Sequence, residues 1–157
     1  QKHGFPATVF LVSDLLGKTS SWLGTEFSDH PPLMSASTVR QLAAEGVNFG
    51  SHACSHPRLS RLDDAQMRRE VFDSKSKLED VLGREVPDFC YPYGEYQPTH
   101  VEQVAAAGYL SATTTLRGRC QGGDALLELP RVPVLRRTHR LLLWWKLVSQ
   151  YEDRRRE

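Results

Sequence analysis

Short apolar runs alternate along this chain with longer segments in which apolar residues recur at helical spacing. The first run, residues 8–12, is rich in β-forming side chains and follows Pro6, which predicts a buried, parallel strand. Residues 17–33 carry Gly, Ser, Asp and Pro with little periodicity and predict a long loop. Further strands are predicted at residues 47–49, 86–91, 109–115 and 127–134.

Helices are predicted between these strands. Ser35 suits the N-cap of a helix that Gly46 ends. The longest helix begins at Asp63, which forms a capping-box pattern with Gln66, and ends at Gly83. Two shorter helices are predicted at residues 101–107 and 141–151. Because strands alternate with helices, we expect an α/β fold built on a parallel sheet or barrel.

The composition narrows the class of protein. A length of 157 residues suits one domain, so we expect residues 1–157 to form a single domain. The hydrophobic share of 39% and the charged share of 25% are ordinary globular values. A formal net charge of +1 gives no electrostatic attraction to a polyanion, so no nucleic-acid partner is expected. Three cysteines without a paired spacing predict no disulfide framework.

The two ends of the chain add two expectations. Residues 1–6 lack the apolar core of a signal peptide, and the first apolar run has the character of a buried strand, so we expect further residues upstream. Residues 141–148 are apolar but far shorter than the about 20 residues that span a membrane. This stretch fits packing in the core, a partner surface or a helix on a membrane surface.

Two histidines four residues apart follow the apolar segment that ends at Phe49, within the stretch His52-Ala53-Cys54-Ser55-His56-Pro57. A helical turn would bring both imidazoles to one face, where they could share a zinc ion. Catalytic zinc sites usually have three protein ligands, so a third ligand must come from elsewhere. Position 53 is alanine, which excludes the His-Glu-x-x-His arrangement and its general base. The alternative is that both are ordinary loop or cap histidines.

Polar residues follow three different predicted strands. Asp14, the histidine pair and Tyr93 all lie at strand carboxyl ends, where ligands gather in parallel α/β folds. This convergence favours a metal site over incidental histidines. Cys54 lies between the histidines, and a thiol nucleophile with His52 or His56 as its base stays open as an alternative.

Four segments carry a family resemblance: residues 3–10, residues 46–57 with the pattern His-x-x-x-His-Pro, residues 89–94 with Tyr91-Pro92-Tyr93-Gly94, and residues 129–134 with Leu129-Pro130-Arg131. Together they resemble the polysaccharide deacetylase family, also called the NodB-homology or carbohydrate esterase 4 family. The resemblance implies an α/β fold, a distorted (β/α) barrel, here without its first β/α unit.

The resemblance also implies an activity, the metal-dependent removal of N-acetyl groups from an acetylated amino-sugar polysaccharide with release of acetate. His52 and His56 would hold a divalent metal, of which zinc is the first choice, and an Asp would be the third ligand. The backbone N–H of Tyr93 would help to hold the oxyanion of a tetrahedral intermediate. Pro92 and Arg131 would bind substrate, and Trp22 would help to shape the sugar cleft.

One family motif has no counterpart in this sequence. The Thr-Phe-Asp-Asp-Gly motif, which supplies the metal-binding Asp and the base, would lie before residue 1, and Asp14 does not match its position. His139 is a candidate for the family's late catalytic acid or simply the start of a solvated helix. The alternative function is a non-catalytic saccharide-binding or scaffold module that has lost the acidic motif. The family's usual substrates imply a cell-envelope or secreted location.

Overall fold

Five strands form one parallel sheet in the computed structural model of this protein, which describes residues 4–23 and 30–155. The strands lie side by side in chain order, and Thr8 to Leu11 of the first pairs in register with Asn48 to Ser51 of the second. Their bounds are Thr8–Leu11 (β1), Asn48–Ser51 (β2), Asp88–Cys90 (β3), Ser111–Arg117 (β4) and Leu129–Arg131 (β5). The predicted α/β fold with a parallel sheet is confirmed.

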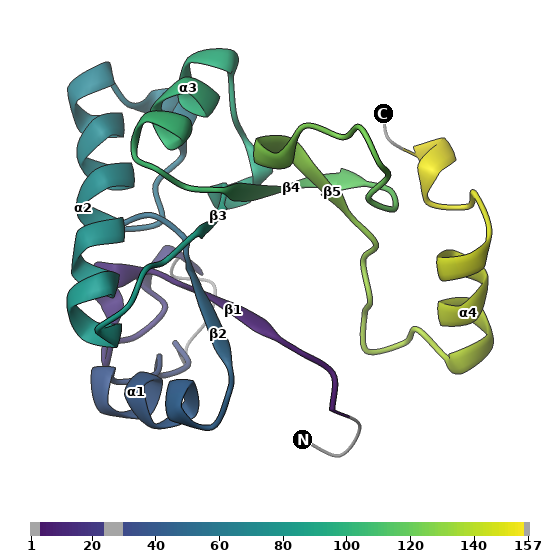
Figure 1. Cartoon of the computed structure of the whole chain (residues 1–157), viewed down its shortest axis with the longest axis horizontal. Coiled ribbons are helices and arrows are strands. Elements are labelled where there is room, and N and C mark those ends of the chain that lie inside the picture. Colours follow the sequence, from purple (N-terminus) through teal and green to yellow (C-terminus); the bar gives the residue numbers. More distant parts are fainter. Residues whose placement is uncertain (1–3, 24–29, 156–157) are drawn as a thin grey trace.

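Three helices cover one side of the sheet, and a fourth lies beyond β5 (Figure 1). The first three are Ala36–Ala44 (α1), Asp64–Leu82 (α2) and Pro98–Ala106 (α3), and the fourth is Arg140–Val148 (α4). The predicted caps are confirmed, since the Ser35 hydroxyl accepts the Thr38 N–H at 3.2 Å. Asp63 and Gln66 form a reciprocal capping box, and Gly83 ends α2 in the left-handed conformation.

The strand boundaries differ from the prediction. Strands β3 and β5 have three residues each, and Pro87, which has no N–H to donate, directly precedes β3. Helix α3 begins at Pro98, three residues before its first apolar position, because proline suits the first turn of a helix. Apolar spacing locates the elements, but the hydrogen bonds set their ends.

The core lies between the sheet and helices α1 to α3. Phe89 is fully buried in this core. The centroid of its ring lies 5.3 Å from that of Tyr91 and 5.1 Å from that of Tyr109. The buried Ser51 hydroxyl donates to the Ser74 hydroxyl at 2.8 Å, and the Tyr109 hydroxyl lies 3.2 Å from Ser74. These bonds satisfy polar groups in the core and fix α2 against the end of β2.

Burial of two tyrosines predicts a loss of stability at alkaline pH. Burial raises the pKa of Tyr109 to about 12, and burial also raises the pKa of Tyr91. Below pH 10 both phenols are protonated in the folded and the unfolded chain, so their contribution to the free energy of unfolding is fully present. Above pH 10 only the unfolded chain releases these protons, so stability falls as the pH rises toward the folded pKa, by up to about 1.4 kcal/mol per pH unit for each tyrosine.

The measurement is the free energy of unfolding in urea between pH 8 and pH 11.5 for the wild type and for Tyr91→Phe with Tyr109→Phe. The double variant should be less stable at pH 8, because it loses hydrogen bonds of Tyr91 to the Leu127 carbonyl oxygen and of Tyr109 to that of Val71. The free energy of unfolding of the double variant should fall less steeply above pH 10 than that of the wild type. Equal slopes would show that these phenols do not cause the alkaline loss.

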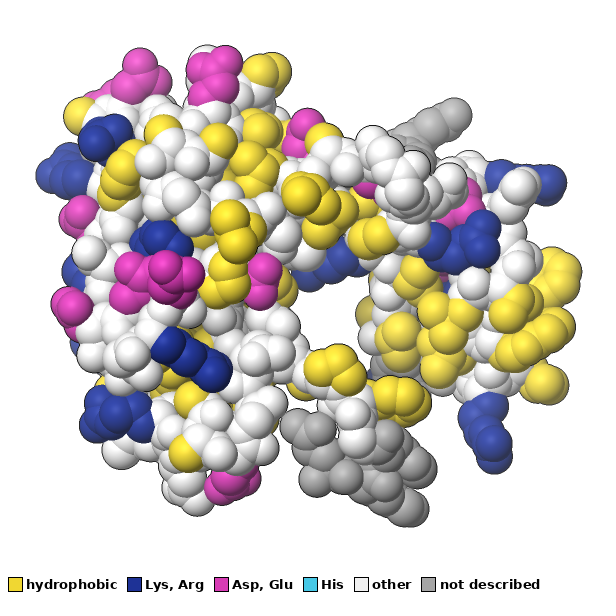
Figure 2. Space-filling view, in the orientation of Figure 1, with side chains coloured by type: hydrophobic (Ala, Val, Ile, Leu, Met, Phe, Trp, Pro, Cys, Tyr) yellow, Lys and Arg dark blue, Asp and Glu magenta, His cyan; other side chains and the backbone are white. Residues whose placement is uncertain are grey.

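Helix α4 presents its apolar side chains to solvent (Figure 2). Leu141, Trp144 and Val148 are 76%, 60% and 53% exposed, and the one buried residue of α4 is Lys146. The Lys146 ammonium pairs with the buried Glu152 carboxylate at 2.8 Å, which also pairs with Arg117 of β4 at 2.7 Å. The core-packing interpretation of this stretch is therefore wrong within the described chain. No described helix is long and apolar enough to cross a membrane.

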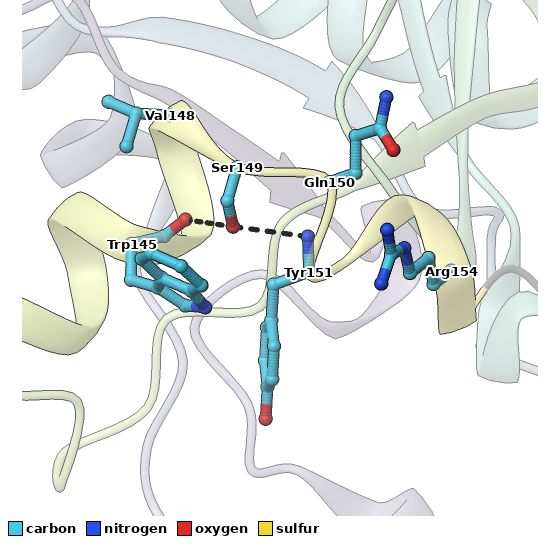
Figure 3. Close-up of a pocket in the computed structure, with 6 residues that line it drawn as sticks. All are labelled: Trp145, Val148, Ser149, Gln150, Tyr151 and Arg154. Atoms are coloured by element: carbon cyan, nitrogen blue, oxygen red, sulfur yellow. Dashed lines mark hydrogen bonds between the residues drawn. The ribbon is translucent and has the colours of Figure 1, made fainter.

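A groove of about 670 Å³ lies beside the end of α4 (Figure 3). The Ser149 hydroxyl donates to the Trp145 carbonyl oxygen at 2.6 Å and accepts the Tyr151 N–H at 3.2 Å, which shapes the turn after the helix. The lining residues are Trp145, Val148, Ser149, Gln150, Tyr151 and Arg154. None of them is a site residue predicted from the sequence, so this groove is separate from the candidate site.

Candidate metal-binding site

Strand β2 carries both histidines to the carboxyl edge of the sheet. The His52 N–H donates to the Leu11 carbonyl oxygen at 2.8 Å, so pairing with β1 continues one residue past Ser51. The chain then forms a loop in which Ala53 and His56 have φ angles of 65° and 63°. The prediction that a helical turn carries the pair is wrong, because a right-handed helix requires negative φ at both positions.

The two imidazoles meet despite this different backbone path. Their ring centroids are 4.6 Å apart, with an angle of 74° between the planes. The His52 Nδ1–H donates to the Cys90 carbonyl oxygen at 2.6 Å, which leaves the Nε2 lone pair free to bind a metal. The His56 Nδ1 atom is buried and has no hydrogen-bond partner among the described residues. An unpaired, buried nitrogen is a position that a metal ion would satisfy.

Electrostatics keep His56 in the form that binds metals. Burial, together with the neighbouring His52, lowers the pKa of His56 to about 4, so its imidazole is neutral at pH 7. Neutral imidazole is a good ligand for zinc and other divalent transition metals. The pair therefore fits two positions of such an ion. Within residues 4–23 and 30–155 no group of three His, Cys, Asp or Glu side chains could hold a metal.

Aromatic side chains surround His56. Trp22, from the short turn Ser21–Leu23, stacks on its imidazole with a centroid distance of 4.6 Å and an angle of 25°. Tyr93 meets the same ring edge-on at 4.7 Å. Trp22, which the sequence placed in the sugar cleft, is thus beside the histidines, and it comes from a segment distant in the sequence.

The turn after β3 presents Tyr93. Its φ angle is 58°, an uncommon conformation for a residue with a side chain, and the following Gly94 has a φ of 71°. The Arg58 guanidinium lies 4.5 Å from the centroid of the Tyr93 ring and forms an ion pair with Glu95. Sequence analysis missed Arg58, and its position directly after the His-x-x-x-His-Pro pattern is the one signal that could have identified it.

Pro92 and Arg131 are placed differently from the histidines. Pro92 is fully buried and begins the turn that holds Tyr93. Arg131 of β5 donates from Nε to the Thr114 carbonyl oxygen at 2.5 Å and lines a groove with Lys146. Burial alone would raise the pKa of the Cys90 thiol, but the neighbouring His52, with smaller contributions from Thr113 and Arg131, lowers it overall. The substrate-binding roles of Pro92 and Arg131 stay predictions.

Three further candidates lie outside the histidine pair. The Asp14 carboxylate forms an ion pair with Lys77 at 2.6 Å. Cys54 is buried, and burial raises the pKa of its thiol, which disfavours the thiolate that a cysteine nucleophile needs. The His139 Nδ1 accepts the Leu142 N–H at 3.3 Å as the N-cap of α4. His139 therefore has the simpler of its two predicted roles, the start of an exposed helix.

The sequence profile of the polysaccharide deacetylase family matches residues 1–112. This chain belongs to the polysaccharide deacetylase family. The matched residues include strands β1 to β3, the histidine pair and the Tyr93 turn. The family resemblance found in the sequence is confirmed.

Two curated proteins similar to this chain carry different names, a lyase and a deacetylase. The chain is 29% identical over 117 residues to a gellan lyase from Bacillus sp. and 27% identical over 108 residues to a chitooligosaccharide deacetylase from Bradyrhizobium sp. (strain ANU 289). These matches cover 74% and 68% of this chain but 4% and 42% of the relatives. The chain thus spans less than half the length of either relative.

Solved structures share the fold of this chain. The deacetylase PplD from Streptococcus pyogenes superposes with a TM-score of 0.81 at 22% identity, over 94% of this chain and 61% of that one. IcaB from Ammonifex degensii gives a TM-score of 0.73 at 20% identity, over 92% of this chain and 63% of that one. At these identities the likeness establishes the α/β architecture of the polysaccharide deacetylase family.

Proposed function

We propose that this chain is part of a metal-dependent N-deacetylase that acts on an acetylated amino-sugar polysaccharide. The observation that carries the proposal is the convergence of His52 and His56, with the buried Nδ1 of His56 left without a hydrogen-bond partner among the described residues. Membership of the polysaccharide deacetylase family supports the same reaction class, hydrolysis of a C–N bond outside peptides. One relative of 27% identity is named a chitooligosaccharide deacetylase, which favours N-acetylglucosamine oligomers as substrates.

Each residue has a proposed part in this reaction. His52 and His56 would hold a divalent metal, with zinc first among the candidates, and the metal would supply Lewis-acid chemistry at the acetamide carbonyl. The Cys90 carbonyl oxygen fixes the orientation of the His52 ring. The backbone N–H of Tyr93 would donate to the oxyanion, and its left-handed conformation sets the direction of that N–H. Trp22 offers an aromatic face beside the site.

A second function is favoured by one observation, the lack of a third metal ligand among the described residues. If no third ligand completes the metal site, the chain would be a saccharide-binding or scaffold module that does not catalyse a reaction. The aromatic rings of Trp22 and Tyr93 would then contact sugar faces. For either function we propose a cell-envelope or secreted location, where such polysaccharides occur.

Acetate release from chitooligosaccharides tests the proposal. The assay compares this chain, alone and with any residues that its natural coding sequence places before residue 1, in zinc-containing buffer. We expect acetate release, and we expect its rate to fall by about two orders of magnitude or more in His52→Ala. His139→Ala is the matched control, because it removes a histidine that caps α4.

Two results would contradict the deacetylase. No acetate from either form, together with oligosaccharide binding that Trp22→Ala weakens, would favour the binding module. Acetate release that His52→Ala leaves unchanged would show that the reaction does not use this site.

A further inference from the structure

One carboxylate holds the loop between the two histidines. Glu70 lies on α2, and its Oε2 accepts the Cys54 N–H at 2.8 Å and the Ser55 N–H at 2.9 Å. Its Oε1 accepts the Ser55 hydroxyl at 2.8 Å. All three hydrogen bonds reach the two residues that lie between Ala53 and His56. Hydrogen bonds to an ionised group are stronger than those between neutral groups, so this contact is a firm clamp on the backbone.

The loop needs such a contact because its conformation is strained. Ala53 and His56 both lie in the left-handed region, which costs about 1–2 kcal/mol for each residue with a side chain. Strained residues persist only where their surroundings fix them. Within this loop the strained positions flank Cys54 and Ser55, the residues that Glu70 binds. Without the carboxylate, the backbone of residues 53–56 could relax to a less strained conformation. We expect this relaxation to move the two imidazoles relative to each other.

Contacts on the opposite side of the loop complete the support. The Ser13 N–H donates to the Ala53 carbonyl oxygen at 3.2 Å, and the Asp14 N–H donates to the Cys54 carbonyl oxygen at 3.0 Å. The segment after β1 thus holds the carbonyl groups of the loop, while Glu70 holds its N–H groups. Glu70 itself has a rigid base, because Met67 and Val71 on either side of it in α2 are buried in the core.

We propose that Glu70 is a positioning residue of the metal site. Its carboxylate bonds neither imidazole, and it acts through the peptide groups of residues 54 and 55 to keep His52 and His56 facing each other. The metal part of this inference rests on the proposed function, whereas the effect on the loop does not. Among the described contacts, no other side chain binds the N–H groups of this loop.

Three variants separate the roles of Glu70. Glu70→Ala removes all three hydrogen bonds, and alanine suits the helix, so α2 should stay folded. Glu70→Gln can keep them, since its amide oxygen accepts the two backbone N–H groups and its NH₂ donates to the Ser55 hydroxyl. Glu79→Ala is the matched control: Glu79 lies on the same helix and accepts the Val86 N–H at 3.0 Å, away from the histidines.

Two measurements are made on the whole chain. Zinc affinity is measured by titration, and hydrogen exchange of the peptide that covers residues 52–57 is measured in the zinc-free protein. Glu70→Ala should raise the zinc dissociation constant about 10- to 100-fold and speed exchange in this peptide. Glu79→Ala should stay close to the wild type in both measurements. Glu70→Gln should lie closer to the wild type than to Glu70→Ala, because it keeps the hydrogen bonds but not their charge.

The outcomes distinguish this inference from the proposed function. If Glu79→Ala weakens zinc binding as much as Glu70→Ala, the effect is general destabilisation and the positioning role is overturned. If the wild type binds no zinc, a site formed by the two histidines alone fails, and exchange then decides the role of Glu70. Faster exchange in Glu70→Ala alone supports the clamp, and unchanged exchange overturns it.

Discussion

Replacing His52 and His56 together with alanine should reduce the zinc affinity of this chain by about 100-fold or more. The two imidazoles have centroids 4.6 Å apart. Among the described residues, the buried Nδ1 of His56 has no hydrogen-bond partner. Loss of a group that only supports a ligand already costs 10- to 100-fold in affinity, so loss of two ligands should exceed this range. The measurement is a zinc titration of both proteins, with the bound metal per chain determined after dialysis.

The control for this experiment is His139→Ala, which removes a histidine from the exposed start of α4. It should bind zinc as the wild type does. Zinc that stays bound to the double histidine variant would contradict the assignment, because the ion would then lie elsewhere. Failure of the wild type to bind zinc would contradict a site formed by two histidines alone and would favour a third ligand from outside this sequence.

Gly94→Ala should lower the free energy of unfolding by about 2–4 kcal/mol. Gly94 has a φ of 71°, and a residue with a Cβ pays about 1–2 kcal/mol for this conformation. The new Cβ would also clash with the Thr115 side chain of β4, and such overpacking costs about 1–3 kcal/mol. Because Gly94 follows Tyr93 directly, relief of this clash should also displace the aromatic ring beside His56.

Urea unfolding of the wild type, Gly94→Ala and Gly122→Ala measures this effect. Gly122 is the matched control, since an added Cβ would meet no atom within 4 Å there and its backbone does not require glycine. Gly122→Ala should change the stability by a few tenths of a kcal/mol at most. Equal midpoints for both variants would show that the turn at Tyr93 can shift without cost.

Local patterns in the sequence were enough to predict the helices and the approximate positions of the strands. The capping residues Ser35 and Asp63 identified two helix starts, because a side chain that caps a backbone N–H acts within a few residues. Strand lengths were predicted less well, since a strand ends where its neighbour stops pairing. The three-residue strands β3 and β5 show this, because apolar residues extend beyond the paired segments.

The site shows the same division. The spacing of His52 and His56 indicated a shared ligand, but the expected helical turn was wrong, because contacts from distant residues stabilise a loop with two positive φ angles. The partners of that loop lie far along the chain, with Glu70 on α2 and the Cys90 carbonyl oxygen at the end of β3. No local rule predicts such contacts, because they depend on how the elements pack.

The sequence by itself determined the family, the α/β class and the histidine pair, because these depend on residue types at fixed spacing. The tertiary structure decided how the pair is held, which rings surround it and that α4 lies outside the core. It also placed Asp14 against Lys77, so that carboxylate is engaged in an ion pair. The physical reason is that hydrogen bonds, burial and ion pairs form between residues that only the folded chain brings together.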